Sequence, residues 1–212
     1  MTRILLTGFE PFGAASINPS EQVVRVLEAE GVSGCELHTA ILPVAASNAP
    51  QRLAALLTEL QPDWCVMLGL ADGRTAISVE RVAVNLCDFG IPDNGGTQLV
   101  DTPIAPDGPD AYFASLPVRA ITEAIRERGI PAELSLSAGA YLCNMAMYSA
   151  LHTADRQALA TRCGFIHLPA TPEMAASARR PMATMALSTI VDGVRAVLAT
   201  LVASGETVEA LP

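Results

Sequence analysis

The chain carries little positive charge. Its 212 residues include 13 Lys and Arg against 22 Asp and Glu, giving a formal net charge of −9. The basic residues form no cluster along the sequence. Because a nucleic-acid backbone is bound by concentrated Lys and Arg, we expect no nucleic-acid partner.

Several motifs of metal, phosphate and serine chemistry are missing as well. The sequence has no Cys-x-x-Cys and no His-Glu-x-x-His, and its three histidines are scattered, so we expect no metal site. Residues 8–13 read Gly-Phe-Glu-Pro-Phe-Gly, and Glu10 stands where a dinucleotide-binding loop needs its middle glycine. No Gly-x-Ser-x-Gly is present, which argues against a serine hydrolase.

Long hydrophobic runs are also scarce. The apolar run near the amino terminus is too short for a signal peptide and leads directly into a strand-like segment. The apolar stretch 182–203 is interrupted by Asp192, Gly193 and Arg195. This pattern favours a packed helix over a membrane span, and we expect no association with a membrane.

Cysteine is present but is neither dense nor paired. The five cysteines are an odd number in a chain of ordinary size, at positions 35, 65, 87, 143 and 163. This usage is typical of reduced thiols rather than a disulfide framework. We therefore expect a cytoplasmic protein.

Strand-length apolar runs alternate with longer segments of helical periodicity. We predict strands at residues 4–7, 36–42, 64–69, 76–86, 133–136 and 164–168. We predict helices at residues 20–30, 48–60, 117–128, 142–153 and 181–203. The alternation indicates one α/β domain over residues 1–212, a three-layer α/β/α sandwich around a twisted, largely parallel (mixed) sheet.

Residues 87–110 have a different composition. They are rich in Gly, Pro and Asn, including Asn94-Gly95-Gly96, which demands turns and excludes long regular elements. We predict one long surface excursion, either a lid or a contact between subunits.

Cys143 lies where a short strand gives way to a helix. The segment from Leu134 ends its strand-like run at Ala138-Gly139, and Cys143 falls in the first turn of the helix that follows. The positive end of the helix dipole favours a thiolate there. The other four cysteines read as ordinary buried residues, so Cys143 is the candidate nucleophile.

Two further side chains could work with this thiol, but the pattern leaves each open. His167 ends a buried strand and is either a base in a cleft or a satisfied core histidine. Glu80 shares a strand face with apolar residues and needs a partner, either Arg74 or Arg81 or a histidine N–H that it orients. His152 is nine residues, or about 13 Å of helix rise, from Cys143 and cannot reach it.

Phe9 and Phe12 lie in a Gly/Pro loop at the carboxyl end of the first strand. Ligands of open α/β sheets bind at that edge. The two rings therefore either line a ligand site or fill the core, and the sequence favours neither.

Four separated blocks make the chain resemble pyroglutamyl peptidase type I, a family of cysteine peptidases. The blocks are 7–13 with Asn18-Pro19, 69–74 with 80–85, 137–144, and 164–169. Shorter matches lie at 91–94, 111–113 and 116–117. They occur in the family's order over most of the chain, so the joint match is specific.

The resemblance implies hydrolysis of the amide bond after an amino-terminal pyroglutamate, with Cys143 as nucleophile, His167 as base and acid, and Glu80 as orienting carboxylate. The Cys143 N–H becomes an oxyanion donor. The pocket for the flat lactam is implied to be lined by Phe9, Phe12, Asn18, Leu70, Ile91, Tyr141 and Leu142. The family also implies pyroglutamyl peptides as partners, a cytoplasmic homotetramer, and no metal or organic cofactor.

One departure from the family pattern bears on the reaction. Gly90 stands where the family often carries an arginine that is thought to stabilise the oxyanion. Losing one such donor costs about 10²–10³ in turnover. Two alternatives therefore stay open, a binding module with weakened catalysis on the same scaffold and a hydrolase of another cyclic amide.

Overall fold

The central strands of the sheet are runs of buried apolar side chains. The computed structural model describes residues 1–13, 15–178 and 181–209, with side chains through residue 204. In β1 (Thr2–Phe9), β3 (Trp64–Leu70) and β8 (Arg162–Leu168) nearly every residue is buried. Such strands are typical of a sheet that is covered on both faces.

These strands belong to a six-stranded sheet with the order β2-β1-β3-β8-β4-β7. The other members are β4 (Ile77–Glu80) and the two edge strands, β2 (Cys35–Leu42) and β7 (Ala132–Ser135). All neighbours are parallel except β4 and β8, which run antiparallel. The sheet is therefore mixed and mostly parallel, as predicted.

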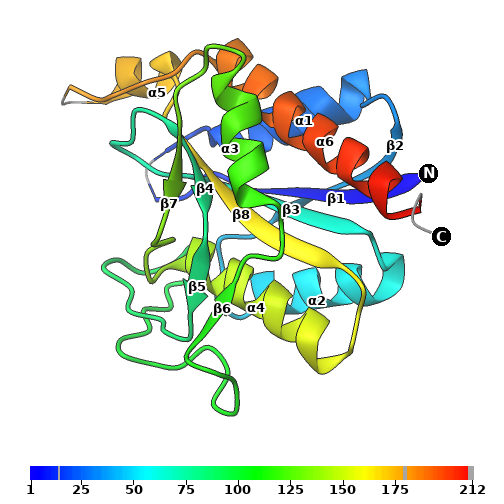
Figure 1. Ribbon diagram of the computed structural model, residues 1–212. Coiled ribbons are helices and arrows are strands. Elements are labelled where there is room, and N and C mark those ends of the chain that lie inside the picture. Colours follow the sequence, from blue (N-terminus) through cyan, green and yellow to red (C-terminus); the bar gives the residue numbers. More distant parts are fainter. Residues whose placement is uncertain (14, 179–180, 210–212) are drawn as a thin grey trace.

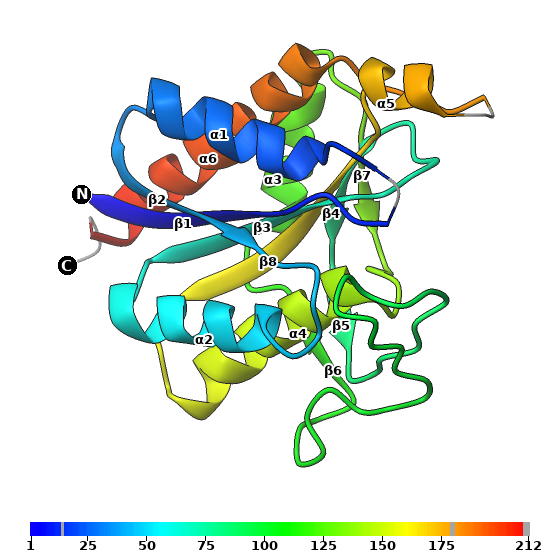
Figure 2. The same cartoon turned by 180° about the vertical axis from the view of Figure 1, so that it is seen from behind.

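Helices cover both faces of the sheet and complete the predicted three layers (Figures 1 and 2). One face carries α1 (Pro19–Glu30), α3 (Val118–Arg126) and α6 (Leu187–Glu209). The other carries α2 (Ala49–Leu60) and α4 (Leu142–Arg156). The short helix α5 (Pro172–Ser177) lies at one end of the sheet, beyond β8.

Helix α6 is apolar because it packs against the core. In the described part of the chain it is the one helix long and apolar enough to cross a membrane, over Leu187–Ser204. Its buried residues include Ile190, Val194, Val197 and Leu201, and it lies against α1 and α3. The predicted packed helix is thus present, although it begins at Leu187 rather than at residue 181. Residues 184–185 instead join Ala170 through a β-bridge and the Met185 N–H.

The prediction of one continuous strand over residues 76–86 is wrong. The chain leaves the main sheet at Arg81, whose N–H donates to Ser135 and whose carbonyl accepts from Ala114. It continues as β5 (Val82–Val84), which pairs with β6 (Ala111–Phe113) in a separate two-stranded sheet. Strand β6 and helix α5 were not predicted, because three and six residues are too short to give a clear period.

Residues 87–110 contain no helix or strand, and every one of them is described. A β-bridge between Cys87 and Thr102 closes the base of the excursion. Figure 1 shows it as the looping segment beside β5 and β6, next to the start of α4. The predicted irregular excursion is therefore present, and it lies where it can contribute to a site at the start of that helix.

Candidate active site

The register of β4 against β8 places Glu80 beside His167. Ser78 pairs with His167 across the two strands, so their side chains share a face of the sheet. Glu80, two residues further along, is on the same face and diagonal to His167. The Nδ1 atom of His167 lies 2.8 Å from Glu80 Oε1, and both side chains are buried.

Cys143 reaches this pair through a space left by a glycine. Gly69 of β3 pairs with His167 of β8. A Cβ added to Gly69 would lie 2.9 Å from Cys143 Sγ and 2.7 Å from Phe165 Cζ. The sulfur therefore sits over Gly69, on the strand next to His167, and the missing side chain makes room for it.

Cys143 and Glu80 interact electrostatically with His167 and shift its pKa. Burial alone lowers the pKa of His167, but the charge of Cys143, a hydrogen bond with that thiol, and the hydrogen bond and charge of Glu80 outweigh it. Together they raise the pKa of His167 to about 9. The imidazole is thus held ready to carry a proton beside the sulfur.

Glu80 has both of the partners that the sequence left as alternatives. Arg74 Nη1 donates to Glu80 Oε1 at 2.7 Å, the same oxygen that faces His167. Burial of Glu80 raises its pKa, yet the hydrogen bonds and charges of its partners, with His167 the strongest, give a net lowering. The carboxylate is therefore kept ionised although it is fully buried.

Asn144 fixes the first turn of α4 next to the nucleophile. Its Oδ1 accepts from the Val84 N–H at 2.9 Å, and its Nδ2 donates to the carbonyls of Val84 at 2.9 Å and Leu86 at 3.0 Å. The side chain is fully buried. It ties the nucleophile helix to the strand that follows Glu80, a role that the sequence analysis did not assign.

A cleft adjoins the sulfur and contains most of the predicted pocket residues. It encloses about 340 Å³, part of it open solvent, and is lined by Phe9, Phe12, Asn18, Val44, Leu70, Tyr141, Leu142 and Cys143. Val44 was not predicted. Every lining side chain is uncharged in its ordinary state, so the cleft suits a flat, neutral group.

Aromatic rings form one wall of the cleft. Tyr141 packs edge-on against Phe89 with ring centroids 4.6 Å apart, and the Phe12 ring is 6.3 Å from it. The Tyr141 hydroxyl donates to the Pro92 carbonyl at 3.2 Å. Residues 89 and 92 belong to the excursion 87–110, which therefore supports this wall.

Glu10 and Asn94 join three loops around the cleft. Glu10 Oε1 accepts from the Val44 N–H and from Asn94 Nδ2, each at 3.0 Å. Asn94 Nδ2 also donates to the Pro11 carbonyl at 3.0 Å, and its N–H donates to the Val44 carbonyl at 2.9 Å. The Asn-Gly-Gly sequence indicated a turn, but nothing local in it indicated these contacts.

Asn18 lines the cleft and also caps a helix. Its Oδ1 accepts from the Ser20 N–H and hydroxyl, at 3.0 and 2.8 Å, at the start of α1. Its Nδ2 donates to the Glu10 carbonyl at 3.0 Å, and the Phe9 N–H donates to Ser20 Oγ at 2.9 Å. The cap of α1 thus holds in place the segment that carries Phe9 and Phe12.

The adjacent residues Gly90 and Ile91 are not among the described residues that line the cleft. The side chain of Ile91 is 51% exposed. A Cβ added to Gly90 would meet no atom within 4 Å, so this position leaves open space.

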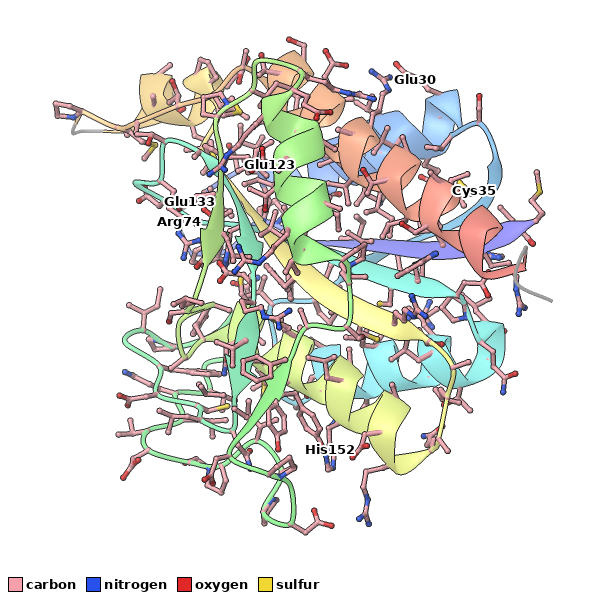
Figure 3. All side chains as sticks on the ribbon, viewed as in Figure 1. Glu30, Cys35, Arg74, Glu123, Glu133 and His152 are labelled. Atoms are coloured by element: carbon pink, nitrogen blue, oxygen red, sulfur yellow. The ribbon has the colours of Figure 1, made fainter. Side chains whose placement is uncertain are left out.

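The remaining titratable and nucleophilic candidates lie elsewhere. His152 Nδ1 is 3.0 Å from the Tyr112 hydroxyl, and Figure 3 shows His152 on α4, well apart from Arg74. The other four cysteines are free and buried. Over the residues that the structure describes, no three His, Cys, Asp or Glu side chains gather as a metal site would require.

Comparison with known proteins agrees with this geometry. The family model for pyroglutamyl peptidase matches residues 2–204. The chain belongs to the pyroglutamyl peptidase family. The pyrrolidone-carboxylate peptidase of Thermococcus onnurineus is 46% identical over 198 residues, 93% of this chain and 98% of that protein. The one of Chromobacterium violaceum is 46% identical over 175 residues, 82% of this chain and 81% of that protein.

Solved structures of the family share the fold. The pyrrolidone carboxyl peptidase of Thermococcus litoralis superposes with a TM-score of 0.92 at 38% identity, covering 98% of this chain and 96% of that one. Pyroglutamyl peptidase I of Bacillus amyloliquefaciens gives a TM-score of 0.90 at 34% identity, covering 96% and 98%.

Proposed function

We propose that this chain is a cysteine-type pyroglutamyl peptidase, which hydrolyses the amide bond after an amino-terminal pyroglutamate. The observation that carries the proposal is that Cys143, His167 and Glu80 come together from α4, β8 and β4 beside an uncharged aromatic cleft. The family membership agrees with the same reaction.

The arrangement supports acyl transfer through a thioester. The Cys143 thiolate attacks the carbonyl carbon, and backbone N–H groups at the start of α4 stabilise the oxyanion. Protonated His167 donates its proton to the leaving amine as the C–N bond breaks. Neutral His167 then takes a proton from water, whose oxygen attacks the thioester and releases pyroglutamate and the sulfur.

Glu80 and the cleft supply orientation and selectivity. Because Glu80 accepts from Nδ1, the Nε2 atom of His167 is left to exchange protons with sulfur and substrate. The rings of Phe9, Phe12 and Tyr141 suit the neutral lactam. A free amino terminus carries a charge, and transferring that charge into this slot without a partner is costly.

Replacing the sulfur tests the proposal. Wild type should release the fluorophore from a pyroglutamyl amide but not from the prolyl or glutaminyl amide, and Cys143→Ser should lose at least about 10³-fold in kcat/KM. Cys35→Ser is the matched control, because Cys35 lies at the far end of the molecule from Arg74 (Figure 3) and should leave turnover unchanged. Full activity of Cys143→Ser, or equal turnover of the prolyl amide, would refute the proposal.

For the assembly and its location we propose a cytoplasmic homotetramer that acts on pyroglutamyl peptides without nucleic acid or membrane. The free cysteines support a reducing compartment. Phe113 and Leu136 are 69% and 72% exposed, and a contact between subunits would remove this apolar surface from water. Light scattering after gel filtration should give four times the 22.1 kDa chain mass, and a monomer at working concentration would contradict the tetramer.

A further inference from the structure

Arg74 contacts two parts of the site at once, the carboxylate of Glu80 and the segment that leads to Cys143. Its Nη1 donates to Glu80 Oε1 at 2.7 Å, and its Nη2 donates to the Ser137 carbonyl at 3.0 Å. Its side chain is only 28% exposed. Figure 3 shows Arg74 close to β4 and β7, where Glu80 ends its strand and the chain turns toward α4.

We propose that Arg74 is a positioning residue for the reaction: its guanidinium fork sets the carboxylate that orients His167 at a fixed place relative to the loop that leads to Cys143. This inference rests on the proposed function of the same three side chains. Arg74 does not touch the reacting atoms and acts through Glu80 and through the backbone at Ser137.

The geometry explains why a fork is needed. One oxygen, Glu80 Oε1, accepts from both Arg74 and His167. Without Arg74 the carboxylate would keep its interactions with His167 and the Ser135 hydroxyl, but Oε1 would have one donor fewer and would be held less firmly beside the imidazole. The guanidinium presents its donors in a rigid plane, and a lysine ammonium on a flexible stem cannot hold both contacts as well.

The second contact of the Arg74 guanidinium, with the Ser137 carbonyl, holds the segment that leads to Cys143. Ser137 lies between β7 and α4, six residues before Cys143, in a stretch where Gly139 has a φ of +77°. A second short contact steadies this stretch, a bond of 3.3 Å from the Ser135 hydroxyl to the Ser137 carbonyl. The carbonyl thus accepts from Arg74 and from Ser135, and both side chains also interact with Glu80. Arg74 is the one of the two that carries a charge.

Because Arg74 is charged, replacing it should shift the pH dependence of the reaction, whereas replacing an uncharged structural residue should not. The titratable groups that face Glu80 are Arg74 from the loop before β4 and His167 from β8, and Cys143 of α4 faces His167. Of their neighbours, Arg81 lies over the Phe113 ring and Glu133 of β7 accepts from Ser78. Removing one positive charge favours the protonated form of every nearby group, so the whole pH profile should move to higher pH.

Two substitutions separate charge from geometry. Arg74→Met should lower kcat at least about tenfold, leave KM within about twofold because Arg74 does not line the cleft, and move both limbs of the kcat/KM profile upward by about 0.5–1 pH unit. Arg74→Lys keeps the charge, so its limbs should stay in place while kcat still falls, because the fork is lost. Arg162→Met, at the far end of β8, removes the same charge and should change neither.

A titration without substrate keeps this inference separate from the proposed function. In Cys143→Ser protein, the His167 ring signals followed by NMR should give a higher pKa when Arg74 is also replaced by Met, whatever amide the enzyme cleaves. Unchanged kcat in both Arg74 variants, or an Arg74→Met profile and His167 titration at the wild-type positions, would overturn the inference. Thermal unfolding of each variant confirms that folded protein is compared, and if Arg74→Met does not fold, the Arg74→Lys result decides.

Discussion

The site joins two regions that are built in different ways. The catalytic side chains stand on regular elements: His167 on β8, Glu80 at the end of β4, and Cys143 in the first turn of α4, with its sulfur over Gly69 of β3. The cleft instead depends on loops, which the contacts of Glu10 and Asn94 hold together. Elements place atoms with little freedom, whereas loops can be adjusted. We therefore expect changes in the first region to affect kcat and changes in the second to affect KM.

The largest effect within the first region should come from Glu80→Gln. The amide is close in shape but carries no charge, so it no longer favours the imidazolium or the tautomer that leaves Nε2 free. We expect kcat to fall by about 10³–10⁴. Cys143 and Glu80 together raise the His167 pKa to about 9. Because the contribution of Glu80 is lost, the pKa of His167 should fall and the alkaline limb of the profile should move to lower pH.

A measurement of kcat/KM across a range of pH, for wild type and Glu80→Gln, would check the direction of that shift. Below the pKa of His167 the imidazolium can protonate the leaving amine, and above it this proton is gone. Wild-type acylation should therefore decline as the pH rises through about 9. An alkaline limb that moves upward in Glu80→Gln would contradict the role given to this carboxylate.

The next effect should come from Gly69→Ala, which changes space and not charge. The new methyl group would lie 2.9 Å from Cys143 Sγ and 2.7 Å from Phe165 Cζ, so the sulfur and the Phe165 ring, which packs against His167, must shift. Misplacing a reacting atom by about 1 Å can cost about 10²-fold, and we expect a loss of that size in kcat. Gly90→Ala is the matched control, since its Cβ meets no atom within 4 Å.

A crystal structure of Gly69→Ala would show whether the sulfur is displaced. Normal turnover with the sulfur still beside His167 would mean that β3 can shift to accept the methyl group, and that the space over Gly69 is not what limits the site.

The smallest effect should come from Asn94→Ala, which releases the loops around the cleft. It removes the side-chain bonds to Glu10 and to the Pro11 carbonyl, and the long bond of 3.4 Å that Asn94 Oδ1 accepts from the Gly13 N–H, while leaving the reacting groups untouched. We expect KM for a pyroglutamyl amide to rise about 5- to 20-fold, or about 1–2 kcal/mol for these lost hydrogen bonds, with kcat changed less than twofold. Steady-state kinetics beside Asn48→Ala, an exposed asparagine outside the cleft, would check this. A fall in kcat with KM unchanged would contradict the assignment of Asn94 to substrate binding.

The two regions also differ in how far the sequence alone predicts them. Cys143 was identifiable as a candidate because a strand–turn–helix transition is a local pattern. The buried-strand pattern located His167 but left its role open between a base and a core histidine. The partner of Glu80 was not identifiable, because it depends on the register of β4 against β8 and on a loop that returns Arg74 to the same oxygen. Both of the expected alternatives, an arginine and a histidine, are present at once.

The loops were harder to predict for the same reason. Val44 and Asn94 reach the cleft through contacts between residues more than thirty positions apart, which no periodicity records. Ile91 entered the expected pocket through family resemblance alone, and the structure leaves it half exposed. Strand β6 was not predicted, because a strand of three residues is stable only when it pairs with another strand, here β5.

The antiparallel pairing of β4 with β8 has a consequence for how this chain can change. Alternation along a strand has a period of two, so inserting or deleting one residue inside β4 turns Glu80 to the opposite side of the sheet. The same event beside Val100, an exposed residue of the excursion 87–110, only alters a loop away from Phe89, Pro92 and Asn94. Length variation should therefore be tolerated around Val100 and should abolish activity in β4, which makes that part of the excursion a place where new surface contacts can be acquired.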